Sequence, residues 1–285
     1  MAEPQLIFHT DEILLEAPNW SRDGRTLYVN GHGVLWALDV DVPVLREVPF
    51  EDLPEINNDH VLSPDGASIY LSAMDGHIYR GALSGGTVER VTDEDGRWHF
   101  LHGVRPDESE LAWVELSDFS APGRLAVGPS RLGPSRRGPS RRGPSRVLAT
   151  GSGHADGPEW SPDGAWIYFN TEGFTSQPGH AQLARIDPRG GQLERLVASD
   201  SVDWFPHLSA DGRHAAYVSF PAGTLGHPAD LDVVVQVVST GDWAAPRQSY
   251  RLFGGQGTMN VNSWAPDSDR FAFIAYPLDG ADVSP

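Results

Sequence analysis

One turn signature recurs six times along the chain, and this repeat constrains the fold more than any other feature. The copies read SRDG, SPDG, RPDE, SPDG, SADG and APDS, at residues 21–24, 63–66, 105–108, 161–164, 209–212 and 265–268. Proline restricts φ, aspartate accepts hydrogen bonds from nearby backbone amides, and glycine adopts positive φ. Each copy therefore predicts a tight turn, and the turns return every 42 to 56 residues.

Each turn is followed by a short segment in which apolar and polar residues alternate. The segments read TLYVN, SIYLS, LAWVE, WIYFN, AAYVS and FAFIA. Alternation with period two is typical of a half-buried strand, and up to four turn-linked strands in such a period indicate one propeller blade. We expect an all-β, six-bladed β-propeller without helices, forming a single domain over residues 1–285. The blades would begin near residues 16, 58, 100, 156, 204 and 260, and an N-terminal strand at Gln5–His9 would complete the last blade.

The repeats also carry a family resemblance. The segments EAPNW, NNDH, DGPEWSPDG, WFPH, GHPAD and FGGQGTMNVNSW make the chain similar to the TolB-like six-bladed propellers, whose repeats contain the signature W-S-P-D-G. The resemblance covers residues 5–277 and is greatest to the stand-alone bacterial members. We expect neither the extra N-terminal domain and leader of TolB itself nor the hydrolase domain of the prolyl oligopeptidases. The resemblance implies the architecture and leaves the activity open.

Composition removes several classes of function. The chain has no cysteine and no lysine, which excludes disulfide scaffolds, thiol nucleophiles, Schiff-base chemistry and a P-loop. The formal net charge of −18 argues against binding to nucleic acid or to anionic membranes. No signal peptide or apolar run of membrane-spanning length occurs, so we expect a cytoplasmic monomer. We expect a small-molecule ligand and neither a nucleotide nor an organic cofactor, with a protein partner as a further option.

Polar side chains gather just before the predicted inner strands, where the channel of a propeller opens. A purely structural inner strand would be small and apolar at these positions. Glycine-rich FGGQGT at 253–258 adds one amide to the same region. We predict ligand contacts from Glu16, Asn58, Asp59, Asp156, Glu159, Trp204, Gln256, Asn260 and Asn262.

Three histidines from three different repeats occupy related positions in this ring. Neutral imidazoles that converge on the channel axis would suit a divalent metal such as Mn²⁺, Ca²⁺ or Zn²⁺. We predict His60, His102 and His207 as its ligands, with Asp59, Asp156 or Glu159 beside them. The alternative is that each histidine hydrogen-bonds the backbone of a neighbouring blade, since no local metal-binding motif is present.

These residues lead to two hypotheses of function. The first is a site for a small polar ligand, a carbohydrate or uronate, with metal assistance and lyase or hydrolase activity. It draws on a resemblance to oligogalacturonate lyase, in which a histidine- and glutamine-bound metal lies at the channel; His227, on the long loop 220–232, would be the catalytic base. The second is a non-enzymatic module for protein interaction or scaffolding, which would present a wide apolar patch instead of a polar ring.

Residues 128–147 consist of four tandem copies of a GPSR-containing pentapeptide. Glycine, proline and serine cannot build a core, and the repeated arginines repel one another. We predict a flexible, solvated loop between a third strand at Arg124–Val127 and a fourth at Val147–Thr150. A basic arm for phosphate or for an acidic partner is the alternative.

Overall fold

The computed structural model of the protein describes residues 3–130, 144–189 and 191–276. Over these ranges the chain forms twenty-two strands and no helix. The described residues accordingly contain no helix of the length and apolarity that crossing a membrane requires. The all-β prediction is confirmed.

Twenty of the strands form five antiparallel sheets of four strands each, and these are the blades of a propeller. The first two blades consist of β1 (Glu16–Trp20), β2 (Thr26–Gly31), β3 (Val34–Asp39), β4 (Leu45–Glu47), β6 (Ile56–Leu62), β7 (Ser68–Ala73), β8 (Ile78–Ala82) and β10 (Glu89–Arg90). Two short strands, β5 (Phe50–Glu51) and β9 (Gly86–Thr87), pair in parallel and link these two blades.

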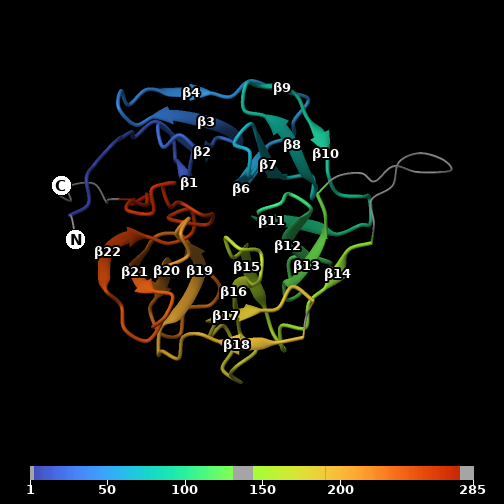
Figure 1. Ribbon diagram of the computed structural model, residues 1–285, viewed down its shortest axis with the longest axis vertical. Coiled ribbons are helices and arrows are strands. Elements are labelled where there is room, and N and C mark those ends of the chain that lie inside the picture. The colour runs from blue at the N-terminus through green and yellow to red at the C-terminus, as the bar shows by residue number, and fades with distance from the viewer. Residues whose placement is uncertain (1–2, 131–143, 190, 277–285) are drawn as a thin grey trace.

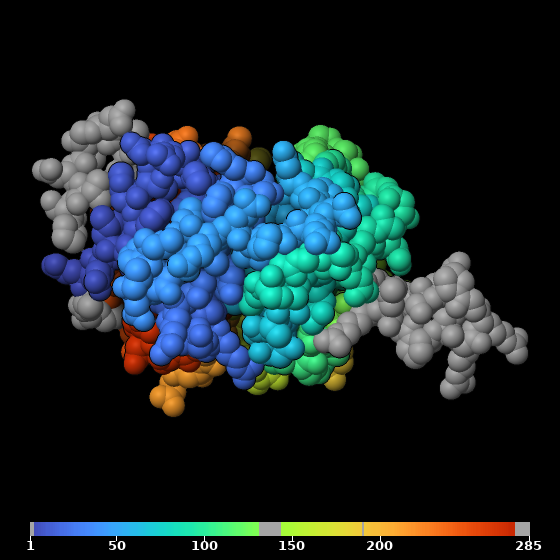
Figure 2. Space-filling view, turned by 90° about the horizontal axis from the view of Figure 1, so that it is seen from above, coloured from blue at the N-terminus to red at the C-terminus, as the bar shows by residue number. Residues whose placement is uncertain are grey.

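The remaining three blades follow in chain order with the same up-and-down topology. Their strands are β11 (Trp98–Val104), β12 (Glu110–Leu116), β13 (Arg124–Pro129), β14 (Arg146–Val147), β15 (Ala155–Trp160), β16 (Ile167–Thr171), β17 (Gln182–Ile186), β18 (Leu193–Arg195), β19 (Val202–Leu208), β20 (His214–Phe220), β21 (Leu231–Ser239) and β22 (Gln248–Gly254). The first strand of each blade lies nearest the centre of the ring and the last lies at the circumference (Figure 1). Viewed from the edge, the first blade in blue and the second in cyan lie side by side (Figure 2).

The repeated turn holds the first two strands of a blade together. In the first blade the Ser21 hydroxyl donates to Asp23 at 2.6 Å and accepts the backbone N–H of Thr26 at 2.9 Å. Ser63 and Ser161 bond to their own turn aspartates in the same way, at 2.5 and 2.6 Å. The serine and aspartate therefore take up backbone groups that the strand ladder leaves unpaired.

The prediction of six blades is wrong, because the structure has five. Up to Tyr276, where the described residues end, the sixth repeat forms no strand and contributes an isolated bridge between Trp264 and Phe271. Two of its asparagines bond locally instead: Asn260 Oδ1 accepts the N–H of Gly257 at 2.7 Å, and Asn262 Oδ1 accepts that of Trp264 at 2.9 Å. Such side-chain bonds compete with a strand ladder, and asparagine and glycine have low strand propensity.

The N-terminal closing strand is also absent, since residues 3–15 contain no strand. Ile7 and Phe8 nevertheless pack against a buried cluster in which Trp20 of the first blade meets Ala265 of the sixth repeat. The segment after β22 thus joins the fifth blade to the first without forming a sheet, as the red trace beside β1 shows (Figure 1). Ala17 N–H donates to the carbonyl of Gly257 at 2.7 Å across this junction.

The GPSR repeat lies mostly outside the described residues, which stop at Ser130 and resume at Pro144. Its flanks belong to the blade, since β13 pairs with β14 through Ala126 and Val147. Arg146 forms an ion pair of 2.6 Å with Glu110. A deletion that tests the predicted loop should therefore spare these flanks. That the repeat itself is a solvated loop stays a prediction.

Candidate functional site

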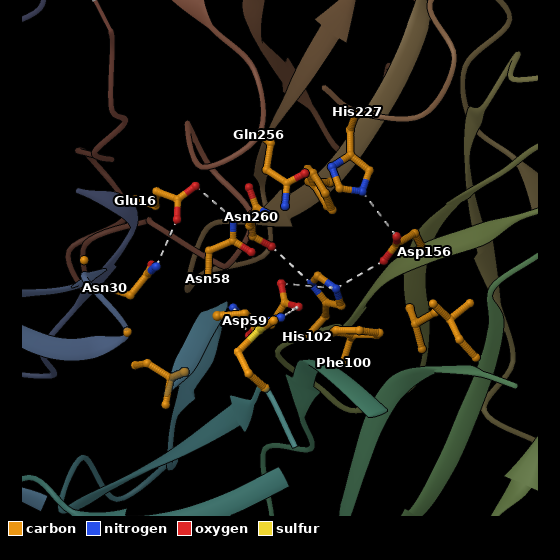
Figure 3. A pocket seen from close by; sticks show the side chains of 18 of the residues that line it. Glu16, Asn30, Asn58, Asp59, Phe100, His102, Asp156, His227, Gln256 and Asn260 are labelled. Atoms are coloured by element: carbon orange, nitrogen blue, oxygen red, sulfur yellow. Dashed lines mark hydrogen bonds and ion pairs between the residues drawn. The ribbon is translucent and has the colours of Figure 1, made fainter. Parts of the chain in front are cut away.

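A cavity of about 600 Å³ opens at one end of the channel, and the inner strands of all five blades contribute to its wall. Eight of the thirteen residues predicted for the site line it, and all eight are labelled in Figure 3: Glu16, Asn58, Asp59, His102, Asp156, His227, Gln256 and Asn260. Five do not line it: His60, Glu159, Trp204, His207 and Asn262.

A bulge in the inner strand aims the side chains of three blades. The register of β1, β15 and β19 shifts after Glu16, Asp156 and Trp204, respectively. The next residue in each strand has positive φ: 53° at Ala17, 61° at Gly157 and 57° at Phe205. Positive φ is strained for a bulky side chain such as phenylalanine, and strain of this kind is enriched at functional sites.

Asp156 is the centre of a buried group of charged and aromatic side chains (Figure 3). Its Oδ1 lies 3.1 Å from His102 Nε2, and its Oδ2 lies 3.1 Å from His154 Nε2. His227 Nε2 is farther away, 3.7 Å from the same Oδ2. Burial acts to raise the pKa of Asp156, but the hydrogen bonds and charges of His102 and His154 outweigh it and hold that pKa well below the usual range. Asp156 is therefore ionised at neutral pH.

His102 carries a positive charge in this arrangement. Its Nε2 faces Asp156 and, at 3.6 Å, Asp59, while its Nδ1 donates to the carbonyl oxygen of Asn260 at 3.2 Å. Acceptors on both sides require a proton on both ring nitrogens. Burial opposes the charge, but the two carboxylates outweigh it and raise the pKa of His102 to about 9.

At Asp59 and His227 burial is the dominant influence, and it favours the neutral form of each side chain. Burial raises the pKa of Asp59 to about 6, although the charge of His102 counteracts part of this shift. Burial lowers the pKa of His227 to about 4, so its imidazole is neutral at pH 7. Trp204, predicted as a ligand contact, instead packs beneath His227 with ring centroids 4.4 Å apart.

Glu16 forms a second polar group on the opposite wall. Its Oε2 accepts a hydrogen bond from Asn30 Nδ2 at 3.0 Å, and its Oε1 accepts one from Asn58 Nδ2 at 3.2 Å. Asn30 comes from β2 and was not predicted from the turn-based alignment, because it lies in the strand after the turn. Its β1 neighbour across the sheet is Glu16. The pairing of β1 with β2 therefore creates this group.

The cavity also has an apolar wall that the search for polar residues did not identify. Phe100, Val114 and Leu116 from the third blade line it together with Phe119, and Phe205 does so from the fifth. Phe119 is 67% exposed and packs against Trp98 with ring centroids 4.7 Å apart and the ring planes tilted by 54°. Phe100 lies five residues before the third turn, as Glu16 and Asp156 do before theirs, but its apolar side chain gives no chemical signal of a site.

Glu159, His207 and Asn262 form a separate network that joins the blades below the cavity. Glu159 Oε2 lies 2.6 Å from His207 Nδ1, and its Oε1 accepts hydrogen bonds from Asn262 Nδ2 and from the backbone of Leu208, both at 2.8 Å. His207 Nε2 donates to the carbonyl oxygen of Met259 at 3.0 Å. This network fits the alternative in which the histidine bonds to the backbone of its neighbours.

The three predicted metal ligands are not brought together. His102 and His207 each use both ring nitrogens in other contacts, and His60 is fully buried with no hydrogen-bond partner among the described residues. In the part of the chain that the structure describes, no group of three histidine, aspartate or glutamate side chains is placed to hold a metal ion. A neutral nitrogen lone pair is what a metal needs, so the donor set does not fit a metal here.

The charge on His102 makes stability depend on pH above neutrality. Its folded pKa of about 9 exceeds the unfolded value of about 6.5, so its contribution is complete below pH 6.5 and is lost as pH rises through 9. Asp59, with a folded pKa of about 6, has finished titrating below this window. We expect the free energy of unfolding to fall by about 2 kcal/mol between pH 7 and 9.5.

Urea denaturation at a series of pH values measures this slope. In His102→Gln the slope should disappear, while His9→Gln, at an exposed histidine, should keep the wild-type slope. A wild-type protein whose stability does not change between pH 7 and 9.5 would show that His102 is not held as a cation.

Comparison with known proteins gives the chain its relatives. No protein-family model matches it. An uncharacterized protein of Agrobacterium fabrum (strain C58) is 36% identical over 278 residues, which cover 95% of this chain and 88% of that protein. A solved structure from Agrobacterium tumefaciens, provisionally named as a TolB, is 34% identical with a TM-score of 0.83, and the match covers 96% of this chain and 94% of that one.

Two more distant structures share the fold alone. TolB from Acinetobacter baumannii is 18% identical with a TM-score of 0.61, over 86% of this chain and 56% of that one. An oligogalacturonate lyase from Vibrio parahaemolyticus is 12% identical with a TM-score of 0.55, over 86% and 68%. The coverage and identity of the two Agrobacterium relatives decide the family, and the chain belongs to the TolB-like propeller proteins.

Proposed function

We propose that this propeller binds a small polar ligand in the cavity at the channel mouth. The observation that carries the proposal is the buried cluster of Asp59, His102 and Asp156 in the wall of a 600 Å³ cavity. Burying charges is costly, and strongly shifted pKa values in a concave site are typical of functional sites. The volume is within the range of small-molecule sites.

The lining favours a ligand with hydroxyl or amine groups over an acidic one. Amide side chains of Asn58, Gln256 and Asn260 can exchange hydrogen bonds with such groups, and Phe100 offers a flat apolar face. Among the described residues that line the cavity there is no arginine, and His102 is already paired with two carboxylates. A carbohydrate remains part of the proposal, whereas a uronate carboxylate would find no unshared cation.

Binding is better supported than lyase chemistry. Abstraction of a proton beside a carboxylate needs a base and a group that neutralises the carboxylate. His227 lines the cavity and is neutral at pH 7, but a pKa of about 4 makes it a weak base. A lyase role would therefore depend on a weak base, and no unshared cation in the described lining would neutralise the substrate carboxylate.

A second candidate function, protein interaction, is favoured by the rim. Leu14, Met74 and Phe119 line the mouth from three successive blades and are 61%, 53% and 67% exposed. Exposed apolar side chains that gather around one opening are typical of interaction sites. Relatives named as TolB are consistent with this candidate.

A ligand screen followed by a matched pair of variants tests the proposal. Thermal-shift assays with neutral sugars, uronates and organic amines should find a compound that raises the melting temperature. Its affinity should then fall about tenfold in Gln256→Ala, since one ligand hydrogen bond is lost. Gln192→Ala, on the exposed outer part of the fourth blade, should bind as the wild type does.

Two results would reject the binding site. One is a screen in which no compound of any class raises the melting temperature. The other is a bound compound whose affinity is equal in Gln256→Ala and Gln192→Ala. In either case Phe119→Ser and Met74→Ser become the variants of interest, because the interaction hypothesis depends on the rim.

A further inference from the structure

We infer that the polar ligand carries an ammonium group and that Glu16 and Asn58 receive it, with Asn30 holding the Glu16 carboxylate in position. The inference rests on the proposed function, and it names the class of ligand and the part of the wall that selects it. The class is an organic amine with an apolar or sugar body.

The orientation of the two amides follows from the carboxylate between them (Figure 3). Carboxylate oxygens only accept hydrogen bonds, so Asn30 and Asn58 must both turn their NH₂ groups toward Glu16. Their carbonyl oxygens then point elsewhere. Asn30 is 4% exposed, and its Oδ1 is buried with no hydrogen-bond partner in the described residues. Asn58 Oδ1 has no protein partner there either.

This group therefore has unused acceptors and an unbalanced charge. Asp59 and Asp156 share the charge of His102, whereas Glu16 forms no ion pair within residues 3–130, 144–189 and 191–276. A buried acceptor without a donor is unfavourable, and most such groups in folded proteins are satisfied. An ammonium group supplies up to three donors and one positive charge, which the Glu16 carboxylate and the amide oxygen of Asn58 can accept, while Asn30 Nδ2 holds the carboxylate in place.

The surroundings favour an organic amine over an inorganic cation. Leu14, Ile56 and Met74 line the same side of the cavity, on the loops and strands of the first two blades that also supply Glu16 and Asn58. Phe100 and Phe119 continue the apolar wall into the third blade. A hydrated metal ion gains nothing from such a wall, whereas the carbon body of an amine is removed from water against it.

The test compares amines with alcohols of the same shape. The probes are glucosamine against glucose and 2-phenylethylamine against 2-phenylethanol, with galacturonate as the acidic compound, each titrated calorimetrically at pH 7. We expect at least one amine to bind at least tenfold more tightly than its uncharged counterpart. In Glu16→Gln the amine affinity should fall tenfold or more, because a charge-assisted contact is lost. The affinity for the uncharged counterpart should stay within twofold.

Glu47→Gln is the matched control, since Glu47 is exposed at the end of β4 in the same blade. It should bind both compounds as the wild type does. Should Glu16→Gln fail to fold, Asn58→Ala replaces it: the carboxylate remains, one amide acceptor is lost, and the amine affinity should fall about threefold or more.

Three outcomes overturn the inference. The first is equal binding of amine and alcohol, and the second is tighter binding of galacturonate than of either amine. The third is an amine affinity that Glu16→Gln and Asn58→Ala leave unchanged. If a sugar or uronate binds and Gln256→Ala weakens it, the proposed binding function stands and only the ammonium inference is lost. If no probe of any class binds, both are rejected.

Discussion

Replacing Asp156 with asparagine should lower the free energy of unfolding at pH 7 by about 3–5 kcal/mol, the usual cost of removing one member of a buried ion pair. Asp156 is the shared acceptor of His102 and His154 and is itself buried. Asparagine preserves the shape but offers one acceptor oxygen and no charge, so the His102 cation keeps only Asp59 nearby. The pKa of His102 should fall, and histidine resonances followed by NMR through a pH titration would show it.

The control is an aspartate of the same blade that is paired at the surface. Asp187 forms an ion pair of 2.8 Å with Arg189, whose side chain is 88% exposed. Asp187→Asn should cost at most about 1 kcal/mol, since exposed pairs contribute little. Equal stabilities for Asp156→Asn and Asp187→Asn in urea denaturation would contradict the charged cluster described for the cavity wall.

Replacing Glu159 with alanine should have an effect of similar size, about 3–5 kcal/mol, with a different origin. The carboxylate accepts from His207, from the backbone of Leu208 and from Asn262, which come from two different parts of the ring. Alanine would leave two buried donors, the His207 ring and the Leu208 N–H, without this acceptor, while Asn262 Nδ2 would keep only the carbonyl oxygen of Leu208. Because Asn262 lies in the segment that joins the fifth blade to the first, this junction should open before the blades do.

Two further variants test whether the stability lost in Glu159→Ala comes from the buried hydrogen-bond network. Glu159→Gln keeps an acceptor oxygen and should lose less stability than Glu159→Ala. Glu194→Ala removes the partner of Arg185 on the outer strand β18 and should lose at most about 1 kcal/mol. Hydrogen exchange of the backbone amides of residues 258–265 would report the opening. Unchanged protection there in Glu159→Ala would show that the network does not hold the junction.

The repeat-based prediction succeeded where the signal was local. A Ser-x-Asp turn followed by alternating residues needs only contacts within one hairpin, and these formed at Ser21, Ser63 and Ser161. The sixth copy of the turn is present, with the backbone of Ser268 bonded to Ala265 at 3.0 Å, but it is not followed by a blade. Turn chemistry is therefore not sufficient for a blade, since the strands must also pair along their length.

In the candidate site, too, local sequence signals predicted some residues correctly, whereas contacts between distant residues decided the others. The polar character of Glu16, Asn58, Asp156 and Asn260 at one position of the repeat was evident from the turn spacing, and all four line the cavity. His102 lies three residues before its turn and His207 two, and the prediction grouped them although His102 lies in the cavity wall and His207 in the network beneath it. Both are histidines near the turn, but the bulge in β19 follows Trp204 and changes which side chains reach the channel.

Hydrogen bonding within a turn and alternation along a strand are properties of neighbouring residues, so the amino-acid sequence alone was enough to establish an all-β propeller of the TolB-like kind. The number of blades and the members of the site depend on contacts between residues far apart in the chain. Asn19 meets the backbone of Asn262, and His102 meets that of Asn260, across 243 and 158 positions respectively. Burial and charge compensation decide those contacts, and they exist only once the ring has closed.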